Sequence, residues 1–145
     1  MEQSFANART NGLDGVYTET RDNAIYEGPE KDWVKTKTTD CLSIKQGKKG
    51  QAQLEVSLVQ ANAHICAFSG PVVVTGNTLV AIPEEAQSKE TGNCQLKIHV
   101  QPKQFVFEDE NNACKAYYCG ARASFDGVKF SRKHRTNWKA NACSY

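Results

Sequence analysis

Strict alternation of apolar and polar residues is the feature that most restricts how this chain folds. In residues 52–58, and again in residues 96–100, every second residue is apolar and the residues between are mostly polar. Successive side chains of a β-strand point to opposite faces, so this period of two predicts strands with one buried face. The sequence shows no comparable period of 3.6, which would mark an amphipathic helix.

Turn sequences separate short β-prone segments along the whole chain. Asn11-Gly12, Asp14-Gly15, Thr75-Gly76-Asn77 and Asp126-Gly127 are examples. The predicted strands are 15–21, 38–46, 51–59, 63–73, 77–82, 94–100, 104–108, 121–125 and 128–132. Strands of this spacing predict an all-β fold in one domain of residues 1–145, either a sandwich or an antiparallel β-barrel of about eight strands. We favour the small barrel because closure removes unpaired sheet edges.

The remaining segments are expected to be irregular or short. Glu110–Tyr118 is the one segment predicted to form a helical turn, residues 1–12 a flexible N-terminus, and residues 83–93 a solvated loop. The expected interior is supplied by apolar side chains that are about sufficient to fill a small barrel without leaving it hollow. These are Leu54, Val56, Leu58, Phe68, Val80, Ile82, Leu96, Ile98, Phe105, Phe107 and Phe125.

The strongest local signal is Asp126-Gly127 between two hydrophobic segments. It predicts a two-residue hairpin with a type I′ turn, in which both central residues have positive φ. Such a hairpin pairs Phe125 with Val128 and Ala123 with Phe130, so that these four share one face. Cys114 and Cys119 lie just before it, and are expected either to staple the turn leading into the hairpin or to join it to a neighbouring strand.

Six cysteines in a chain of 145 residues indicate an oxidising compartment. The first residues have no apolar signal-peptide core, so we expect a signal peptide to have been removed ahead of Met1. A cytosolic zinc protein is the alternative, but only Cys114 and Cys119 are close, and no pair of histidines has metal-ligand spacing. We therefore expect no metal, no cofactor and no free thiol. The lack of an Asn-x-Ser/Thr site favours a bacterial periplasm over a eukaryotic secretory source.

The pairing of the cysteines is less constrained by the sequence. We predict Cys66–Cys94, because a strand meander would bring the starts of strands 63–73 and 94–100 to the same end. We also predict Cys114–Cys119, with Cys94–Cys114 as the main competitor.

Positive charge is concentrated near the C-terminus. Residues 115–139 contain seven Lys or Arg and one acid, Asp126, so their net charge is 7 − 1 = +6, against +2 for the whole chain. Either these are ordinary solvated side chains, or they dock an anionic partner. Arg122 could instead pair with a carboxylate such as Asp109. The predicted partner-binding residues are Tyr117, Tyr118, Arg122, Asp126, Lys129, Arg132, Lys133 and Arg135.

The order of several motifs resembles that of small bacterial cell-envelope proteins with two disulfides and a barrel-like strand pattern. The motifs are His-x-Cys-x-x-x-Gly at 64–70, Cys-x-Leu-x-Ile at 94–98, Phe-x-Asp at 107–109, then Cys114, and Cys-Gly-Ala-Arg at 119–122. The resemblance covers about residues 15–130. It implies that Cys41 and Cys143 are an additional pair, bonded to each other.

Proteins of this kind are architecturally similar to periplasmic lysozyme inhibitors and to immunity proteins against secreted cell-wall effectors. The resemblance therefore implies a periplasmic or secreted binding protein that acts as an inhibitor or immunity factor. The concentration of positive charge places its expected binding surface on the basic C-terminal hairpin. Its expected partner is an acidic protein such as a cell-wall hydrolase or toxin. The Ser-Gly…Tyr loop motif of the lysozyme inhibitors is absent, since Ser69-Gly70 is followed by Pro71-Val72, which argues against lysozyme itself.

Two other function classes are considered. A lipocalin-like carrier would enclose a small ligand within an eight-stranded barrel. An enzyme would need an activated nucleophile or a phosphate-binding loop, and the sequence has neither a G-x-S-x-G motif nor a glycine-rich phosphate loop. His64 or His99 with a glutamate could perform acid–base chemistry, but we do not expect an enzyme. No membrane span is expected, and the net charge of +2 does not favour nucleic acid.

Overall fold

The computed structural model describes residues 12–27, 32–60, 64–88 and 92–144, with the side chains of residues 24–27, 32–34 and 88 excepted. Its strands are β1 (Gly15–Glu27), β2 (Asp32–Gln46), β3 (Gln51–Gln60), β4 (His64–Thr75), β5 (Thr78–Ala81), β6 (Gln87–Ser88), β7 (Gly92–Asn93), β8 (Leu96–Val100), β9 (Gln104–Asp109), β10 (Lys129–Ser131) and β11 (Arg135–Thr136). Short helical turns are Glu84–Ala86, Glu110–Asn112 and α2 (Lys115–Tyr118). The predicted helical turn at 110–118 is thus confirmed.

A single curled sheet of nine antiparallel strands makes up most of the fold, in the order β10-β9-β8-β5-β4-β3-β2-β1-β11. The predicted antiparallel β class is therefore confirmed. Within the described residues, however, the hydrogen-bonded strands do not close into a barrel. Strands β10 and β11 lie at opposite ends of the strand order, although only residues 132–134 separate them in the chain. The two sheet edges approach each other there, where Ser131 N of β10 donates to Glu19 Oε1 of β1 (2.7 Å).

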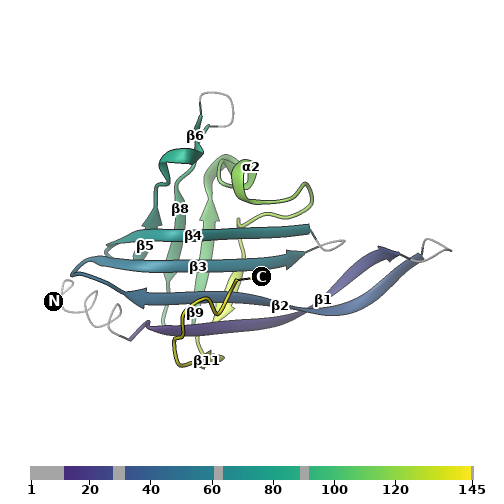
Figure 1. Cartoon of the computed structure of the whole chain (residues 1–145), viewed down its shortest axis with the longest axis horizontal. Coiled ribbons are helices and arrows are strands. Elements are labelled where there is room, and N and C mark those ends of the chain that lie inside the picture. Colours follow the sequence, from purple (N-terminus) through teal and green to yellow (C-terminus); the bar gives the residue numbers. More distant parts are fainter. Residues whose placement is uncertain (1–11, 28–31, 61–63, 89–91, 145) are drawn as a thin grey trace.

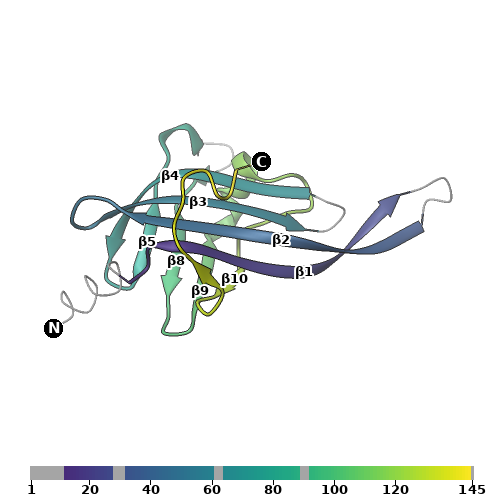
Figure 2. The ribbon, with the colours of Figure 1, turned by 60° about the horizontal axis from the view of Figure 1, so that its bottom comes forward.

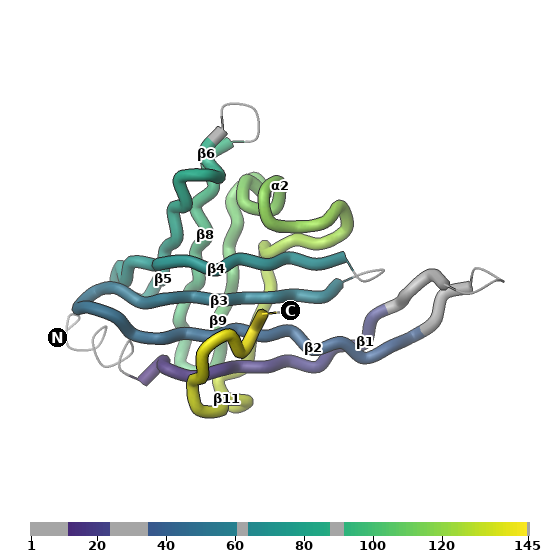
Figure 3. The backbone as a smooth tube through the Cα atoms, in the orientation of Figure 1, coloured from purple at the N-terminus to yellow at the C-terminus, as the bar shows by residue number. Residues whose placement is uncertain are grey.

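The sheet forms two layers that enclose the core. Strands β1–β4 lie along one direction and strands β5, β8 and β9 cross behind them, as Figure 1 and the tube in Figure 3 show. The layers are joined where β4 pairs with β3 along most of its length and with β5 at its end, through Val73–Val80. Aromatic side chains fill the space between them: Tyr17, Phe105, Phe107, Phe125 and Phe130 are almost completely buried.

Most of the predicted core is confirmed, with two exceptions. In β3 the side chains of Leu54, Val56 and Leu58 are buried, as the alternation predicts. Val80 is only half-buried and Ile82 is 59% exposed, so the expectation that they belong to the core is wrong. Their neighbours Leu79 and Ala81 take the inward positions. Residues 79–82 are all apolar, so alternation could not decide which face is buried.

The hairpin of β1 and β2 is longer than predicted. Its ladder continues to Glu27↔Asp32, whereas the pairing of β2 with β3 stops at Cys41↔Ser57. The distal part of this hairpin projects from the two layers in Figure 1. It is polar on both faces where its side chains are described, so it carries no alternation by which a strand could be recognised.

The predicted strand at 121–125 is not formed, although Ala123 and Phe125 are buried as its alternation requires. The side chain of Gln60 pairs with this segment in place of a neighbouring strand. Gln60 Nε2 donates to Ser124 O (2.7 Å) and Gln60 Oε1 accepts from Ser124 N (2.9 Å). The Gln60 amide therefore takes the place of a neighbouring strand at Ser124, while the carbonyls of Ala121 and Ala123 accept from Lys115 Nζ.

The Asp126-Gly127 turn differs from the predicted type I′ geometry. Gly127 has φ of 80°, but Asp126 is not among the residues with positive φ, and Val128 N donates to Phe125 O (3.0 Å). One positive φ at the third residue is the pattern of a type II turn. Asp126 also has a structural role, because its Oδ1 accepts a hydrogen bond from Asp109 N (2.9 Å).

Substituting Gly127 tests this turn directly. A Cβ at Gly127 meets no atom within 4 Å, so any cost comes from the positive φ alone. We expect Gly127→Val to lower the free energy of unfolding by about 1–3 kcal/mol, and Gly127→Asn, which tolerates positive φ, to cost much less. Urea unfolding of both variants measures this difference. Equal losses for valine and asparagine would contradict the assigned backbone conformation.

All six cysteines form disulfides, but two predicted pairings are wrong. Cys41–Cys143 is confirmed, while the other bonds are Cys66–Cys119 and Cys94–Cys114 in place of Cys66–Cys94 and Cys114–Cys119. Cys94 precedes β8 and Cys114 follows β9, and the antiparallel pairing of these strands, Leu96↔Asp109, brings both cysteines to one end. The backbone of Cys119 instead forms a single antiparallel β-bridge with that of Cys66 in β4.

The C-terminal segment lies across the outer face of β2 and β3, as Figures 1 and 2 show from two directions. Besides the Cys41–Cys143 bond, Cys143 N donates to Glu55 Oε1 (3.1 Å) and Ser144 Oγ donates to Glu55 Oε2 (2.9 Å). The Lys45 ammonium lies 5.1 Å from the centre of the Trp138 ring. These contacts fix the chain that follows β11 against the sheet.

Two segments that were predicted to be irregular are described only in part. The expected flexible N-terminus, residues 1–12, lies outside the described residues except for exposed Gly12. The expected solvated loop at 83–93 includes the turn Glu84–Ala86 and the pair β6–β7, and Ala86 is completely buried, so it is not solvated throughout. No helix within the described parts of the chain is long and apolar enough to cross a membrane.

Candidate binding surface at the basic end

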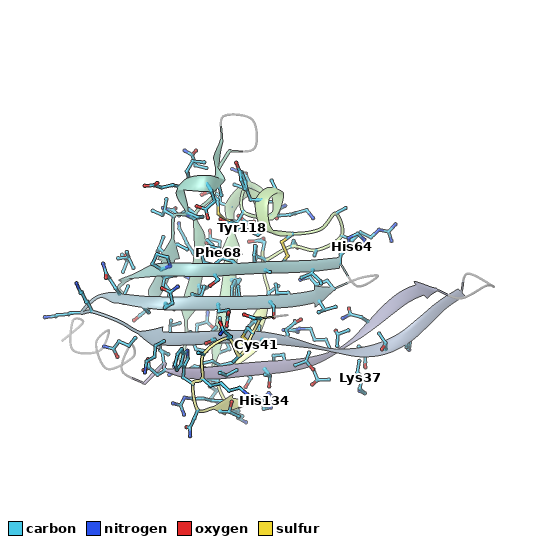
Figure 4. All side chains as sticks on the ribbon, in the orientation of Figure 1. Lys37, Cys41, His64, Phe68, Tyr118 and His134 are labelled. Atoms are coloured by element: carbon cyan, nitrogen blue, oxygen red, sulfur yellow. A yellow bond between two sulfur atoms is a disulfide. The ribbon has the colours of Figure 1, made fainter. Side chains whose placement is uncertain are left out.

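The predicted partner-binding residues divide between two separate parts of the molecule. Tyr117 and Tyr118 lie on α2, whereas Arg132, Lys133 and Arg135 lie in and beside the turn between β10 and β11. Figure 4 shows Tyr118 beyond β4 and His134 beyond β1, with β3 and β2 between them. The linear concentration of positive charge therefore does not correspond to one continuous surface.

At the α2 part, the side chains mainly hold the fold together. Tyr118 OH donates to Glu85 Oε1 (2.8 Å), and its ring packs edge-on against Phe68 at 5.2 Å. Burial, followed by the Glu85 carboxylate, raises the pKa of Tyr118. Tyr117 is 48% exposed, and Arg122 is exposed with no ion pair among the described residues.

The suggested pairing of Arg122 with Asp109 is not formed. Asp109 is buried, and its two oxygens accept hydrogen bonds from Cys114 N and Lys115 N, both 2.9 Å. The Lys115 ammonium also turns inward, donating to Ala121 O (2.9 Å) and Ala123 O (2.6 Å). Neither Asp109 nor Lys115 is therefore available to a partner.

A hollow of about 350 Å³ lies at the opposite end, and four cationic side chains line it: Lys103, Arg132, Lys133 and Arg135. We call these four residues the basic pocket. Gly12, Tyr17 and Pro102 complete the lining, which contains no carboxylate. Lys103 comes from the turn between β8 and β9 and was not among the predicted residues. Its place in a turn between two predicted strands, next to Pro102, was the only sequence signal for it.

Both arginines of the basic pocket are held in place by backbone carbonyls. Arg132 Nη1 donates to Gln101 O (3.0 Å), and its guanidinium lies 5.7 Å from the centre of the Phe105 ring. Arg135 Nε donates to Asp14 O (2.7 Å). Each guanidinium has five N–H donors, so several remain available after these contacts.

The floor of the basic pocket is formed by Tyr17. Its hydroxyl donates to Leu13 O (2.8 Å), and its ring packs edge-on against Phe105 at 4.8 Å. Burial raises the pKa of Tyr17, and this effect outweighs the opposing influence of Arg135 and Arg132. Tyr17 therefore remains neutral at physiological pH and does not cancel the positive charge around it.

The neighbouring residues have different roles. Lys129 is exposed on β10, and its carbonyl accepts from Arg21 Nη2 (2.5 Å). His134 lies with its Nδ1 3.6 Å from Glu19 Oε1, so it faces β1 rather than the hollow. The described residues include no cluster of three His, Cys, Asp or Glu side chains that could hold a metal ion. The arrangement at the basic end is suited to binding an anion.

A second polar arrangement lies on the outer face of β5, β8 and β9. His99 Nε2 lies 2.7 Å from Glu108 Oε1, and Thr78 Oγ1 lies 3.4 Å from His99 Nδ1. His99 was one of the two histidines considered for acid–base chemistry, and it does lie beside a glutamate. Both side chains of this pair are about 40% exposed.

The His99–Glu108 contact predicts a specific pH dependence. The hydrogen bond from His99 lowers the pKa of Glu108 below its ordinary value of 4.5. A carboxyl whose pKa is lower in the folded state stabilises the fold above pH 4.5, and this contribution is lost as the pH falls through the lower value. In His99→Phe we expect the pKa of Glu108 to rise toward its ordinary value of 4.5 in an NMR titration. An unchanged pKa in this variant would contradict the assigned contact.

Comparison with known proteins identifies no relative. No family model matches the chain, and neither a curated protein nor a solved structure matches it.

Proposed function

We propose that this protein is an extracytoplasmic binding module whose basic pocket docks an acidic protein partner, acting as an inhibitor or immunity factor against a secreted cell-wall hydrolase. The observation that carries the proposal is the basic pocket itself: two arginines held by backbone carbonyls and two lysines surround one hollow without a carboxylate. Positioned guanidinium groups bind carboxylates with less loss of conformational freedom than mobile ones.

The proposed class of partner follows from the chemistry of the pocket. Most enzymes that cleave glycans act through a pair of Asp or Glu carboxylates in a cleft. The β10–β11 turn, with Arg132, Lys133 and Arg135 in and beside it, can enter such a cleft and pair with those carboxylates. The three disulfides indicate an oxidising, extracytoplasmic compartment, and we assign the protein to the periplasm or the secreted fraction.

A lipocalin-like carrier receives less support from the fold. It would need space between the two layers, where Phe105, Phe107 and Phe125 are almost completely buried and pack among other core residues. These rings fill the space that an internal ligand would need. The ring centres of Phe107 and Phe125, for example, are 6.3 Å apart.

Capture of a partner from a bacterial envelope extract tests the proposal. The bait is the wild-type protein beside Lys103→Glu/Lys133→Glu, since neither lysine side chain forms a hydrogen bond or ion pair within the described parts of the chain. Lys48→Glu/Lys49→Glu, in the exposed β2–β3 turn, is the matched control with the same change of net charge. We expect the wild type and the control to retain one hydrolase that the Lys103/Lys133 variant loses. Equal capture by all three baits would contradict the proposal that the basic pocket binds the partner.

A further inference from the structure

An open groove of about 650 Å³ lies on the outer face of the sheet, and it shares no lining residue with the basic pocket. Its lining comes from β3, β4, β5 and β8 and from the residues flanking β5 and β8. The residues that the argument uses are Pro71, Val73, Val80, Ile82 and Lys97. We call this feature the outer groove.

The strand register explains why apolar side chains gather there. Val73 pairs with Val80, and Val80 pairs with Lys97, so these three side chains form one row on the same face. Pro71 and Ile82 lie two residues away from Val73 and Val80, so they extend the apolar floor on that face. Val73 is 53% exposed and Ile82 is 59% exposed, which is unusual for aliphatic side chains that lie side by side.

Charge differs between the two ends of this apolar floor. Lys97 is the only charged residue that lines the outer groove. Its cross-strand neighbour Glu108 lies outside the lining, and the Oε1 of Glu108 lies 2.7 Å from His99 Nε2. At the other end, Pro71 and Ile82 are shared with an adjoining hollow of about 370 Å³ that is lined by Glu84 and Glu85. An anionic group is therefore favoured at the Lys97 end and disfavoured at the Glu84–Glu85 end.

We propose that the outer groove binds a single-chain anionic amphiphile, with the aliphatic chain on Val73, Val80 and Ile82 and the anionic head group at Lys97. The volume of the groove lies within the range of about 300–1,000 Å³ that is typical of small-molecule sites. The long side chain of a lysine can cover apolar surface with its methylene groups and keep its ammonium at the rim, where a head group would lie. This binding does not depend on the basic pocket or on its partner.

Dodecanoate and dodecyltrimethylammonium, both below their micelle concentrations, are the test probes. They share one aliphatic chain and carry opposite head-group charges. We expect dodecanoate to bind saturably in calorimetry and to shift the NMR signals of Val73, Val80 and Ile82. We expect the cationic probe to bind several-fold more weakly. Lys97→Gln should weaken dodecanoate several-fold and leave dodecyltrimethylammonium unchanged.

Two further variants separate the outer groove from general surface hydrophobicity. Val80→Ser/Ile82→Ser should weaken dodecanoate at least tenfold, whereas Ile65→Ser, which changes an aliphatic residue of β4 that is 40% exposed, should have no effect. Thermal melting of each variant verifies its fold. The proposal is overturned if dodecanoate fails to bind, if both serine variants bind it equally, or if sedimentation shows that a second copy of the chain covers the groove.

Discussion

Replacing Cys66 and Cys119 together by alanine is expected to lower the free energy of unfolding by about 2–5 kcal/mol. The bond closes a loop with a sequence separation of 53 and joins β4 to the chain that follows α2. Cys66 is completely buried, so the substitution also removes a sulfur from the core. Nearby, Gly120 N donates to Ile65 O (2.8 Å), so one end of β4 would lose its covalent attachment and retain only weaker contacts. A loss of this size shifts the melting temperature by roughly 6–20 °C.

Cys41→Ala/Cys143→Ala is the comparison for this prediction. The Cys41–Cys143 bond attaches the C-terminal segment, in which residues 137–141 are exposed, to the outer face of β2. We expect its removal to increase hydrogen exchange mainly in residues 137–144, whereas removal of Cys66–Cys119 should increase exchange in α2 and β4. A shift of 2 °C in melting temperature corresponds to roughly 0.5 kcal/mol in the free energy of unfolding. A Cys66/Cys119 variant whose melting temperature lies this close to that of the wild type would contradict the role given to this bond.

Asp40→Ala is expected to lower the free energy of unfolding by about 2–4 kcal/mol. Asp40 is 1% exposed, and its Oδ1 accepts from Val59 N (2.8 Å) while its Oδ2 pairs with Arg21 Nε (2.5 Å). Removing one partner of a buried pair typically costs about 3–5 kcal/mol, and we reduce this range because the Arg21 side chain is 38% exposed.

The position of Asp40 makes the loss structural as well as electrostatic. Arg21 also donates to Lys129 O, so the Asp40 carboxylate orients a side chain that joins β1 to β10 across the opening of the sheet. Asp40→Asn retains an acceptor for Val59 N and should cost less than alanine. The exposed pair Asp22–Lys37 (3.2 Å) provides the control, and Asp22→Ala should change stability by less than about 0.5 kcal/mol. Similar denaturant midpoints for Asp40→Ala and Asp22→Ala would contradict the stabilising role given to the Asp40 carboxylate.

The sequence predicted strands well wherever a strand has one buried face. Residues 52–58 and 96–100 alternate because one face packs on the core, and both form strands as expected. The distal part of the β1–β2 hairpin has no such face, so its extension to Glu27 and Asp32 could not be recognised. Alternation reports burial and not the hydrogen-bond partner. Residues 121–125 were therefore predicted as a strand, although their backbone is bonded by the side chains of Gln60 and Lys115 rather than by a neighbouring strand.

The candidate site was predictable only in part, because charge along a sequence does not show where side chains point. Arg132, Lys133 and Arg135 were predicted and do lie together in the basic pocket. Lys115 contributed to the same count of charge, but its ammonium is bonded to two carbonyls of the next segment. Lys103 enters the basic pocket from a different turn, and only the antiparallel pairing of β10 with β9 brings it there.

The kinetics of association with the captured partner test the central claim most directly. Rim charges act mainly on the association rate, and their effect weakens as salt screens them. We predict that Arg132→Glu/Lys133→Glu/Arg135→Glu associates at least tenfold more slowly than the wild type at low salt, and that its rate depends less on ionic strength. Lys48→Glu/Lys49→Glu should retain the wild-type salt dependence. Equal association rates and equal salt dependence for the triple variant and the wild type would contradict the proposal that the basic pocket docks the partner.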